Sequence, residues 1–254
     1  MPRVQAAGRS LNYEWIGSGA QGRPALVFLH EGLGSIRQWR DFPAKVSAET
    51  GCRALVYDRY GYGDSDVLVE AKRSIGFMHD EALRALPEML QKLKIENPVL
   101  IGHSDGASIA LIHAGGGFAV KAVVAMAPHV FIEPICLESI RQAAVSFETT
   151  DLKNKFDKYH LDSRKTFYGW ADVWLDPDFE RWDIRDDFLP KIACPVLAIQ
   201  GEDDEYGTMA QLDDTARRVK RCELLKLPEC GHSPFRDQPA KVLSGVKEFL
   251  EKNR

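Results

Sequence analysis

The sequence predicts an α/β fold with a mostly parallel central sheet flanked by helices. Three observations support this prediction: short apolar runs recur along the chain, turn residues follow each run, and a helical pattern usually comes next. Nearly continuous apolar runs suit strands that helices cover on both faces. The clearest runs are 25–29, 54–57, 98–101, 121–126, 196–200 and 223–227.

Helical patterns fill the gaps between these runs. Residues 81–93 place Leu83, Leu86, Leu90 and Leu93 at the three- and four-residue spacing of one buried helical face. Further helices are expected over 107–114 and 240–250. Segment 4–16 alternates more strongly between apolar and polar residues, which predicts an antiparallel hairpin at the edge of the sheet.

One long stretch interrupts the alternation of strands and helices. Residues 131–190 contain no convincing strand and are rich in Asp, Lys and aromatic residues. Because a plain loop of this length is unusual in a compact domain, we expect a small helical cap inserted after the sixth strand. The cap would cover the carboxyl edge of the sheet, where open α/β sheets bind ligands. The predicted domains are a core of residues 1–131 and 191–254 and a cap of residues 132–190.

Composition excludes several classes of partner. The chain has 254 residues, 44% hydrophobic and 28% charged, which is ordinary for a globular protein. A formal charge of −4 gives no electrostatic reason to expect nucleic acid or a membrane surface as partner. The first residues lack the apolar region of a secretory signal, and no run is long enough to span a bilayer. We therefore expect a cytoplasmic protein with a small-molecule substrate and no cofactor; the oligomeric state stays open, with a homodimer as one option.

The five cysteines are scattered along the chain, and without an export signal they are expected to be buried reduced thiols. Cys222, Cys230 and His232 lie close in sequence, but their spacing matches no zinc pattern. No metal site is therefore predicted.

The strongest local signal for chemistry is Gly102-His103-Ser104-Asp105-Gly106, between a predicted strand and a predicted helix. A sharp strand-to-helix turn would strain the backbone of Ser104 and expose its hydroxyl as a nucleophile. Side chains two positions to either side would collide in such a turn, which accounts for Gly102 and Gly106.

A serine hydroxyl needs a base to remove its proton. His232 is the best placed of the seven histidines, because it follows the last predicted strand and can reach the carboxyl edge of the sheet. An acid should then orient the imidazole, and the acidic run of residues 202–205 follows the preceding strand. The order serine, acid, histidine agrees with one of the known triad orders. From spacing alone, Asp203 and Asp204 are both candidates, and the other carboxylates of the run are expected to be solvated.

The remaining requirement is an oxyanion hole for the charge that develops on the carbonyl oxygen. One donor should be the backbone N–H of Asp105, directly after the nucleophile. The second should come from His30-Glu31-Gly32-Leu33-Gly34, which follows the first predicted strand of the core. Gly32 is the first choice for this donor and Leu33 the alternative.

With these motifs in order, the chain resembles the α/β-hydrolase superfamily over nearly its whole length. The matching segments are residues 30–34, 58–65, 102–106, 201–204 and 231–232. The resemblance implies the α/β-hydrolase fold, and it implies Asp204 as the acid, because relatives commonly place it three residues after a glycine that ends the strand. It also implies that segment 58–65 is structural. Since the elbow residue is Ser104, the resemblance disfavours the dehalogenase and epoxide hydrolase branches, which use Asp.

Glu31 departs from the pattern, since many relatives have His-Gly at this point. A carboxylate aimed into the oxyanion hole would oppose the developing negative charge. We therefore expect Glu31 to point away and to pair with Arg37, Arg59 or a nearby backbone N–H.

The cap supplies the candidate substrate contacts. Trp170 and Trp174 are four residues apart and share a helical face. At least one of Phe167, Trp170 and Trp174 is expected to contact substrate, although most cap aromatics should simply pack the cap onto the core.

The expected activity is hydrolysis of a small carboxylic ester through an acyl-enzyme, as in carboxylesterases. An amide, a lactone or a thioester stays open as the substrate. A second hypothesis keeps the triad but cleaves a carbon–carbon bond in a vinylogous β-diketone, which typically needs a cation for the substrate carboxylate. A third hypothesis is a binding module on a hydrolase scaffold, which would show a broken triad or a sealed pocket.

Overall fold

The computed structural model describes residues 2–254 and contains one eight-stranded sheet. All six strands predicted for the core are present, with ends that differ by one or two residues. Across the sheet the order is β1-β2-β4-β3-β5-β6-β7-β8. The strands are β1 (Arg3–Ala6), β2 (Arg9–Ile16), β3 (Leu26–Leu29), β4 (Ala54–Tyr57), β5 (Val99–His103), β6 (Ala122–Met126), β7 (Val196–Gly201) and β8 (Cys222–Leu227).

The first two strands form the predicted edge hairpin. β1 pairs antiparallel with β2, and β2 pairs antiparallel with β4. All pairs from β4 to β8 are parallel. The carboxyl ends of these six strands therefore meet along one edge, which confirms the predicted arrangement.

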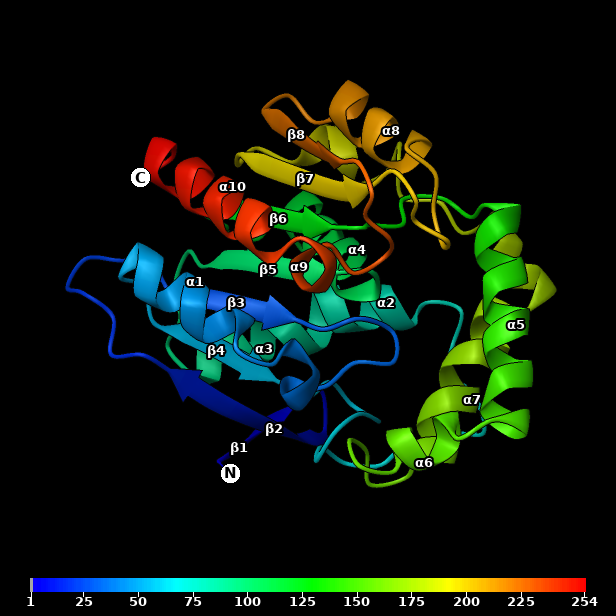
Figure 1. Cartoon of the computed structure of the whole chain (residues 1–254). Helices are drawn as coiled ribbons and strands as arrows, with labels where there is room; N and C mark the ends of the chain where they lie inside the picture. Colours follow the sequence, from blue (N-terminus) through cyan, green and yellow to red (C-terminus); the bar gives the residue numbers. More distant parts are fainter. Residues whose placement is uncertain (1) are drawn as a thin grey trace.

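Helices cover both faces of the sheet (Figure 1). α1 (Phe42–Thr50) and α10 (Pro239–Lys252) lie on one face, and α2 (Phe77–Asp80), α3 (Leu86–Lys92) and α4 (Asp105–Gly115) lie on the other. Alternate residues of each strand point to opposite faces. In β3, Leu26 and Phe28 accordingly pack in one apolar core, and Val27 and Leu29 pack in the second. The sheet is thus buried on both faces, as its continuous apolar runs predicted.

The helix predicted over residues 81–93 is interrupted. A π-helical turn, η2 (Glu81–Ala85), joins α2 to α3. Pro87 lies in the first turn of α3 and has no backbone N–H to donate to the preceding turn. Leucine spacing predicts the buried face but does not reveal the extra residue of a π-turn.

The segment between β6 and β7 is helical and lies beyond the carboxyl ends of the strands, at the right of Figure 1. Its main elements are α5 (Pro134–Thr149), α6 (Leu152–Phe156), α7 (Ser163–Trp174) and η3 (Pro177–Arg181). This is the position expected for the cap, and the boundaries at residues 132 and 190 stay a prediction. The other helical elements are η1 (Ile36–Trp39), η4 (Leu189–Lys191), α8 (Ala210–Arg218) and α9 (Pro234–Asp237). Within residues 2–254, we find no helix with the length and apolar character to cross a bilayer.

The segment after β4 is organised by the buried carboxylate of Asp58. Its Oδ1 accepts the backbone N–H of Ile36 at 2.7 Å, and its Oδ2 accepts the Asn12 side-chain amide at 2.8 Å and the backbone N–H of Asp64 at 3.0 Å. A Cβ at Gly63 would lie 2.1 Å from the carboxyl carbon of Asp58, and Gly63 also has a φ of +53°. One carboxylate thus joins the edge strand, the loop after β3 and the turn after β4.

Replacing Asp58 by alanine should remove the acceptor that the buried backbone N–H of Ile36, the Asn12 amide and the backbone N–H of Asp64 share. We expect the free energy of unfolding to fall by about 2–4 kcal/mol, from about 1–3 kcal/mol for each unsatisfied donor. Urea denaturation followed by circular dichroism measures this change. Asp41→Asn, at an exposed carboxylate, is the control and should change stability by less than about 0.5 kcal/mol; equal stability of the two variants would contradict the role of Asp58.

Candidate active site

Ser104 lies in a sharp turn between β5 and α4. Its backbone has φ 53° and ψ −122°, a strained conformation for a residue with a side chain. A Cβ on Gly102 would lie 2.3 Å from the carbonyl oxygen of Gly106, and a Cβ on Gly106 would lie 2.0 Å from that of Leu29. Both contacts are far below van der Waals separation. The predicted strain and the predicted need for two glycines are therefore present.

His232 and Asp204 form a continuous hydrogen-bonded chain with the serine. His232 Nε2 lies 3.0 Å from Ser104 Oγ, and His232 Nδ1 lies 2.8 Å from Asp204 Oδ1. The three residues come from the carboxyl ends of β5, β7 and β8, and all three are buried. The fold thus brings together residues that are up to 128 positions apart in the sequence.

The geometry distinguishes the two candidate acids. Asp203 is exposed, whereas Asp204 is buried and contacts the imidazole. Asp204 Oδ1 also accepts the backbone N–H groups of Tyr206 at 2.8 Å and Gly207 at 3.2 Å. These two donors fix the orientation of the carboxylate that contacts His232.

The charge of Asp204 prepares the histidine as a base. Burial by itself lowers the pKa of His232, but the hydrogen bond and the negative charge of Asp204 outweigh it and leave the pKa above its usual 6.5. Burial raises the pKa of Asp204, and the contacts with His232 reverse that effect, so this carboxyl has a lowered pKa. Asp204 therefore stays ionised, and His232 loses its own proton at a higher pH than an unperturbed histidine.

The three residues expected to supply the oxyanion donors all line the cavity beside Ser104. Asp105 opens α4, and the first N–H groups of a helix have no partner within that helix. Gly32 and Leu33 lie opposite, in the loop after β3, and line the same cavity as Ser104. A Cβ at Gly32 would lie 2.1 Å from Nε1 of Trp170, so glycine is required here by a cap side chain.

A cavity of about 130 Å³ opens next to Ser104. Trp170 and Trp174 from α7 form part of its wall. Phe167 is not among the lining residues that the structure describes; its ring is fully buried and stacks on Phe147 at a centroid distance of 4.1 Å. Of the three expected substrate contacts, the two tryptophans are at the cavity and Phe167 packs inside the cap.

Glu31 pairs with a base as predicted, but neither Arg37 nor Arg59 is the partner of its carboxylate. Its Oε1 lies 3.2 Å from Arg236 Nη2, and its Oε2 lies 3.4 Å from His103 Nδ1. Arg37 instead lies 3.6 Å from Asp64. Arg59 does approach Glu31, but it donates to the backbone carbonyl oxygen at 2.8 Å. Arg236 follows His232 in α9, so its arrival beside Glu31 depends on the tertiary fold rather than on any local pattern.

Three further residues surround the histidine. His129 follows β6 and lies with its ring centroid 5.8 Å from that of His232, and Tyr206 lies 4.7 Å from it. Glu205, expected to be merely solvated, accepts the backbone N–H of His232 at 3.1 Å. All three line the cavity. His129 could have been found from the sequence, because it follows a predicted strand at the same sheet edge as the other site residues.

Of the five cysteines, Cys136 lines the cavity beside Ser104. Cys52, Cys136 and Cys230 are buried as expected, but Cys194 and Cys222 are only half-buried. Cys194 lies two residues before β7, and Cys222 is the first residue of the edge strand β8. Within residues 2–254, we find no group of three or more potential metal ligands.

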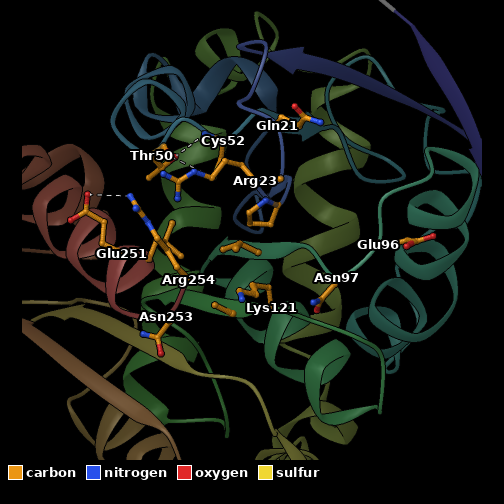
Figure 2. Close-up of a pocket in the computed structure, with 15 residues that line it drawn as sticks. Gln21, Arg23, Thr50, Cys52, Glu96, Asn97, Lys121, Glu251, Asn253 and Arg254 are labelled. Carbon is orange, nitrogen blue, oxygen red and sulfur yellow. Dashed lines mark hydrogen bonds and ion pairs between the residues drawn. The ribbon is translucent and has the colours of Figure 1, made fainter.

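A larger cavity of about 620 Å³ lies away from Ser104 (Figure 2). It lies at the amino ends of the parallel strands, between segment 21–24 and the end of α10. Its charged side chains have both signs, and Arg254 lies 3.7 Å from Glu251 within it. Because no hydroxyl, base and acid converge there, size alone is a poor guide to the reactive site.

Comparisons with known proteins agree with this geometry. Residues 26–244 match the Alpha/beta hydrolase family. The chain therefore belongs to the α/β-hydrolase family.

Curated relatives match over most of their length. AB hydrolase superfamily protein YisY of Bacillus subtilis (strain 168) is 24% identical, over 90% of this chain and 91% of that protein. The 2-hydroxy-6-oxononadienedioate/2-hydroxy-6-oxononatrienedioate hydrolase of Paraburkholderia xenovorans (strain LB400) is 26% identical, over 94% of this chain and 90% of that protein. Among solved structures, MGS-M2, an alpha/beta hydrolase enzyme from a Medee basin deep-sea metagenome library, has a TM-score of 0.77 at 22% identity and covers 98% of this chain and 97% of its own. These matches support a hydrolase fold and span several activities.

Asp204→Asn should test the orientation of His232. We expect kcat to fall by about 100-fold or more, because an amide can favour the wrong imidazole tautomer. Loss of the negative charge also lowers the pKa of His232, so the acid limb of kcat/KM should move to lower pH. Asp203→Asn, one residue away and exposed, is the matched control. Equal activity of the two variants across the pH range would contradict this assignment.

Gly32→Ala should test the contact between the cap and the loop after β3. The new methyl group would lie 2.1 Å from Trp170 Nε1 and force the indole or the loop to move. We expect a loss of about 100-fold in kcat/KM, the effect of a misplacement of about 1 Å. The double variant Gly32→Ala with Trp170→Leu should regain part of this loss, and a double variant worse than both single variants would argue against the clash.

Proposed function

We propose that this protein is a serine hydrolase that cleaves small carboxylic esters through an acyl-enzyme. The observation that carries the proposal is the chain from Asp204 Oδ1 through the His232 imidazole to Ser104 Oγ, with contacts of 2.8 and 3.0 Å. Both distances suit proton transfer without a preceding rearrangement. The surrounding cavity also favours an enzyme over a binding module, whose pocket would be sealed or whose triad would be broken.

In the first half of the reaction, His232 Nε2 takes the proton of Ser104 as Oγ attacks the ester carbonyl carbon. The carbonyl electron pair moves to its oxygen, which the N–H groups of Asp105 and of Gly32 or Leu33 stabilise. The bond to the alcohol then breaks, and His232 returns the proton to the leaving oxygen. The product of this half-reaction is an acyl group on Ser104.

In the second half, water replaces the alcohol. His232 removes a proton from the water as its oxygen attacks the acyl carbon, and the same N–H groups stabilise the second oxyanion. Collapse releases the carboxylic acid, and Ser104 recovers its proton from His232. Asp204 stays ionised throughout and stabilises the imidazolium that forms in each half.

The cavity favours a short acyl group. Its volume of about 130 Å³ is below the roughly 300–1,000 Å³ of typical ligand pockets. Trp170 and Trp174 supply apolar wall, and no Lys or Arg occurs among the lining residues that the structure describes. The relative in Paraburkholderia keeps carbon–carbon bond hydrolysis as the second candidate. A substrate with an added carboxylate would, however, need a cation that this cavity wall does not provide.

A series of p-nitrophenyl esters tests the proposal. We expect hydrolysis of the acetate and butyrate, and a kcat/KM for the octanoate lower by tenfold or more, because its chain exceeds the cavity. The initial rate of p-nitrophenolate release, followed by its absorbance at about 405 nm, measures this dependence.

Ser104→Ala is the control for this series. It should lose at least about 1,000-fold of the activity, since the remaining oxyanion donors give only residual catalysis. A folded wild-type protein that cleaves none of the esters would exclude this substrate class. An octanoate rate equal to the butyrate rate would exclude the proposed size limit.

A further inference from the structure

Glu31 connects the loop that supplies the oxyanion donors to the loop that carries His232. The side chain leaves the chain next to Gly32, in the wall of the cavity, and is 18% exposed. Its two carboxylate oxygens face different elements: Oε1 lies 3.2 Å from Arg236 in α9, and Oε2 lies 3.4 Å from His103 in β5. Both partners act on the segment around His232.

His103 contacts the backbone of the catalytic histidine. Its Nε2 lies 2.7 Å from the backbone carbonyl oxygen of His232. A carbonyl oxygen only accepts hydrogen bonds, so Nε2 of His103 must carry the hydrogen. In the neutral ring, Nδ1 then holds a lone pair, and a second acceptor beside it would be repelled. Burial lowers the pKa of His103 to about 4, so this ring is neutral at neutral pH, and the ionised Oε2 of Glu31 lies beside its Nδ1 lone pair without accepting a hydrogen bond from it.

Arg236 makes the connection between the two loops. It donates to Glu31 Oε1 and, at 3.0 Å, to the backbone carbonyl oxygen of Gln38. Arg236 lies four residues after His232, in α9. Glu31 therefore fixes the short helix that follows His232.

The backbone around Glu31 has an anchor of its own. Arg59 donates to the carbonyl oxygens of His30 at 3.2 Å and Glu31 at 2.8 Å. A variant that lacks the carboxylate keeps these bonds, so the loop should still fold. Such a variant loses the contact that holds the oxyanion loop and the His232 loop in their relative positions, which we call their register.

We infer that Glu31 is a positioning residue for the reaction of Ser104, holding the oxyanion loop and the His232 loop in register through its ion pair with Arg236. This inference rests on the proposed function in requiring Ser104 to be the nucleophile, but it does not depend on which bond the enzyme cleaves. The carboxylate contributes without contacting the substrate oxygen, because both of its oxygens are directed to protein partners.

The charge of Glu31 has a second effect, on the base itself. Burial lowers the pKa of His232, and Asp204, followed by Glu31 and Glu205, raises it. Removal of the Glu31 charge should therefore lower the pKa of His232 and extend activity to lower pH. The charged and titratable groups that face Glu31 or His232 from the surrounding elements are His103, Asp105, His129, His160, Asp204, Glu205, Tyr206 and Arg236.

The test compares Glu31→Leu with Glu31→Gln by labelling Ser104 with a fluorophosphonate. In this reaction Ser104 Oγ bonds to phosphorus, fluoride leaves, and His232 takes the serine proton, while the phosphoryl oxygen occupies the oxyanion hole. Labelling thus reports the register of both loops without requiring any particular ester. The second-order rate constant is measured from pH 5 to 9, a range that brackets the usual pKa of histidine at about 6.5.

At the alkaline end, Glu31→Leu should label about tenfold or more slowly than wild type, whereas Glu31→Gln should stay within about threefold. The glutamine amide can donate to His103 Nδ1 and its oxygen can accept from Arg236, so the connections persist without the charge. The acid limb of the labelling rate of Glu31→Gln against pH should lie at lower pH than that of wild type. The exposed Glu202, changed to Leu and to Gln, is the matched control and should alter neither the rate nor the limb.

Two results would overturn the inference. One is labelling of Glu31→Leu within threefold of wild type. The other is equal slowing of both Glu31 variants, which would leave no role for the hydrogen-bonding geometry. Thermal unfolding of each variant separates loss of register from loss of fold. Failure of the proposed function is distinct: wild type would then label with the fluorophosphonate but cleave no ester.

Discussion

The structure depends on one close approach, between the turn at Ser104 and the end of β3. The Cα of Gly106 lies so near the Leu29 carbonyl oxygen that a side chain there would leave only 2.0 Å between them. This approach lets α4 begin directly behind the loop after β3. Asp105, Gly32 and Leu33 consequently line the same cavity. Ser104 and the residues proposed as oxyanion donors can converge only because neither Gly102 nor Gly106 has a side chain.

The site also illustrates how a hydrolase tolerates several carboxylates beside a developing negative charge. Asp204 and Glu31 each have partners that direct their charge away from the substrate carbonyl, namely His232 for the first and Arg236 for the second. Asp105 is buried with its carboxylate 3.9 Å from Arg59. The carboxylates therefore act on the protein groups behind the cavity, where they stabilise cationic imidazole and guanidinium groups rather than oppose the oxyanion.

Much of this arrangement could be predicted from the sequence, because the signals are local. The apolar runs predicted each core strand, and glycines at residues 102 and 106 predicted the turn. The choice of Asp204 came from resemblance to a family, since adjacent carboxylates cannot be ranked by spacing alone. Burial of Asp204 and exposure of Asp203 supply the physical reason.

What could not be predicted depends on contacts between distant segments. The neighbours of the Glu31 carboxylate, His103 and Arg236, lie 72 and 205 positions further along the chain. Only the tertiary fold brings them beside Glu31. The interior placement of Phe167 could not be predicted either, because Trp170 and Phe167 have the same helical and aromatic character in the sequence. Only the stacking of Phe167 on Phe147 decides which of the two faces the cavity.

The contact between Gly32 and Trp170 limits how this cap could diversify. Nε1 of Trp170 lies only 2.1 Å from the point where any other residue at position 32 would have its Cβ. A cap grafted from another hydrolase would lack this fit unless its own indole, or a smaller group, met the same glycine. The cap and the loop after β3 are therefore a matched pair, and exchange of one without the other would alter the enzyme's chemistry as well as its selectivity.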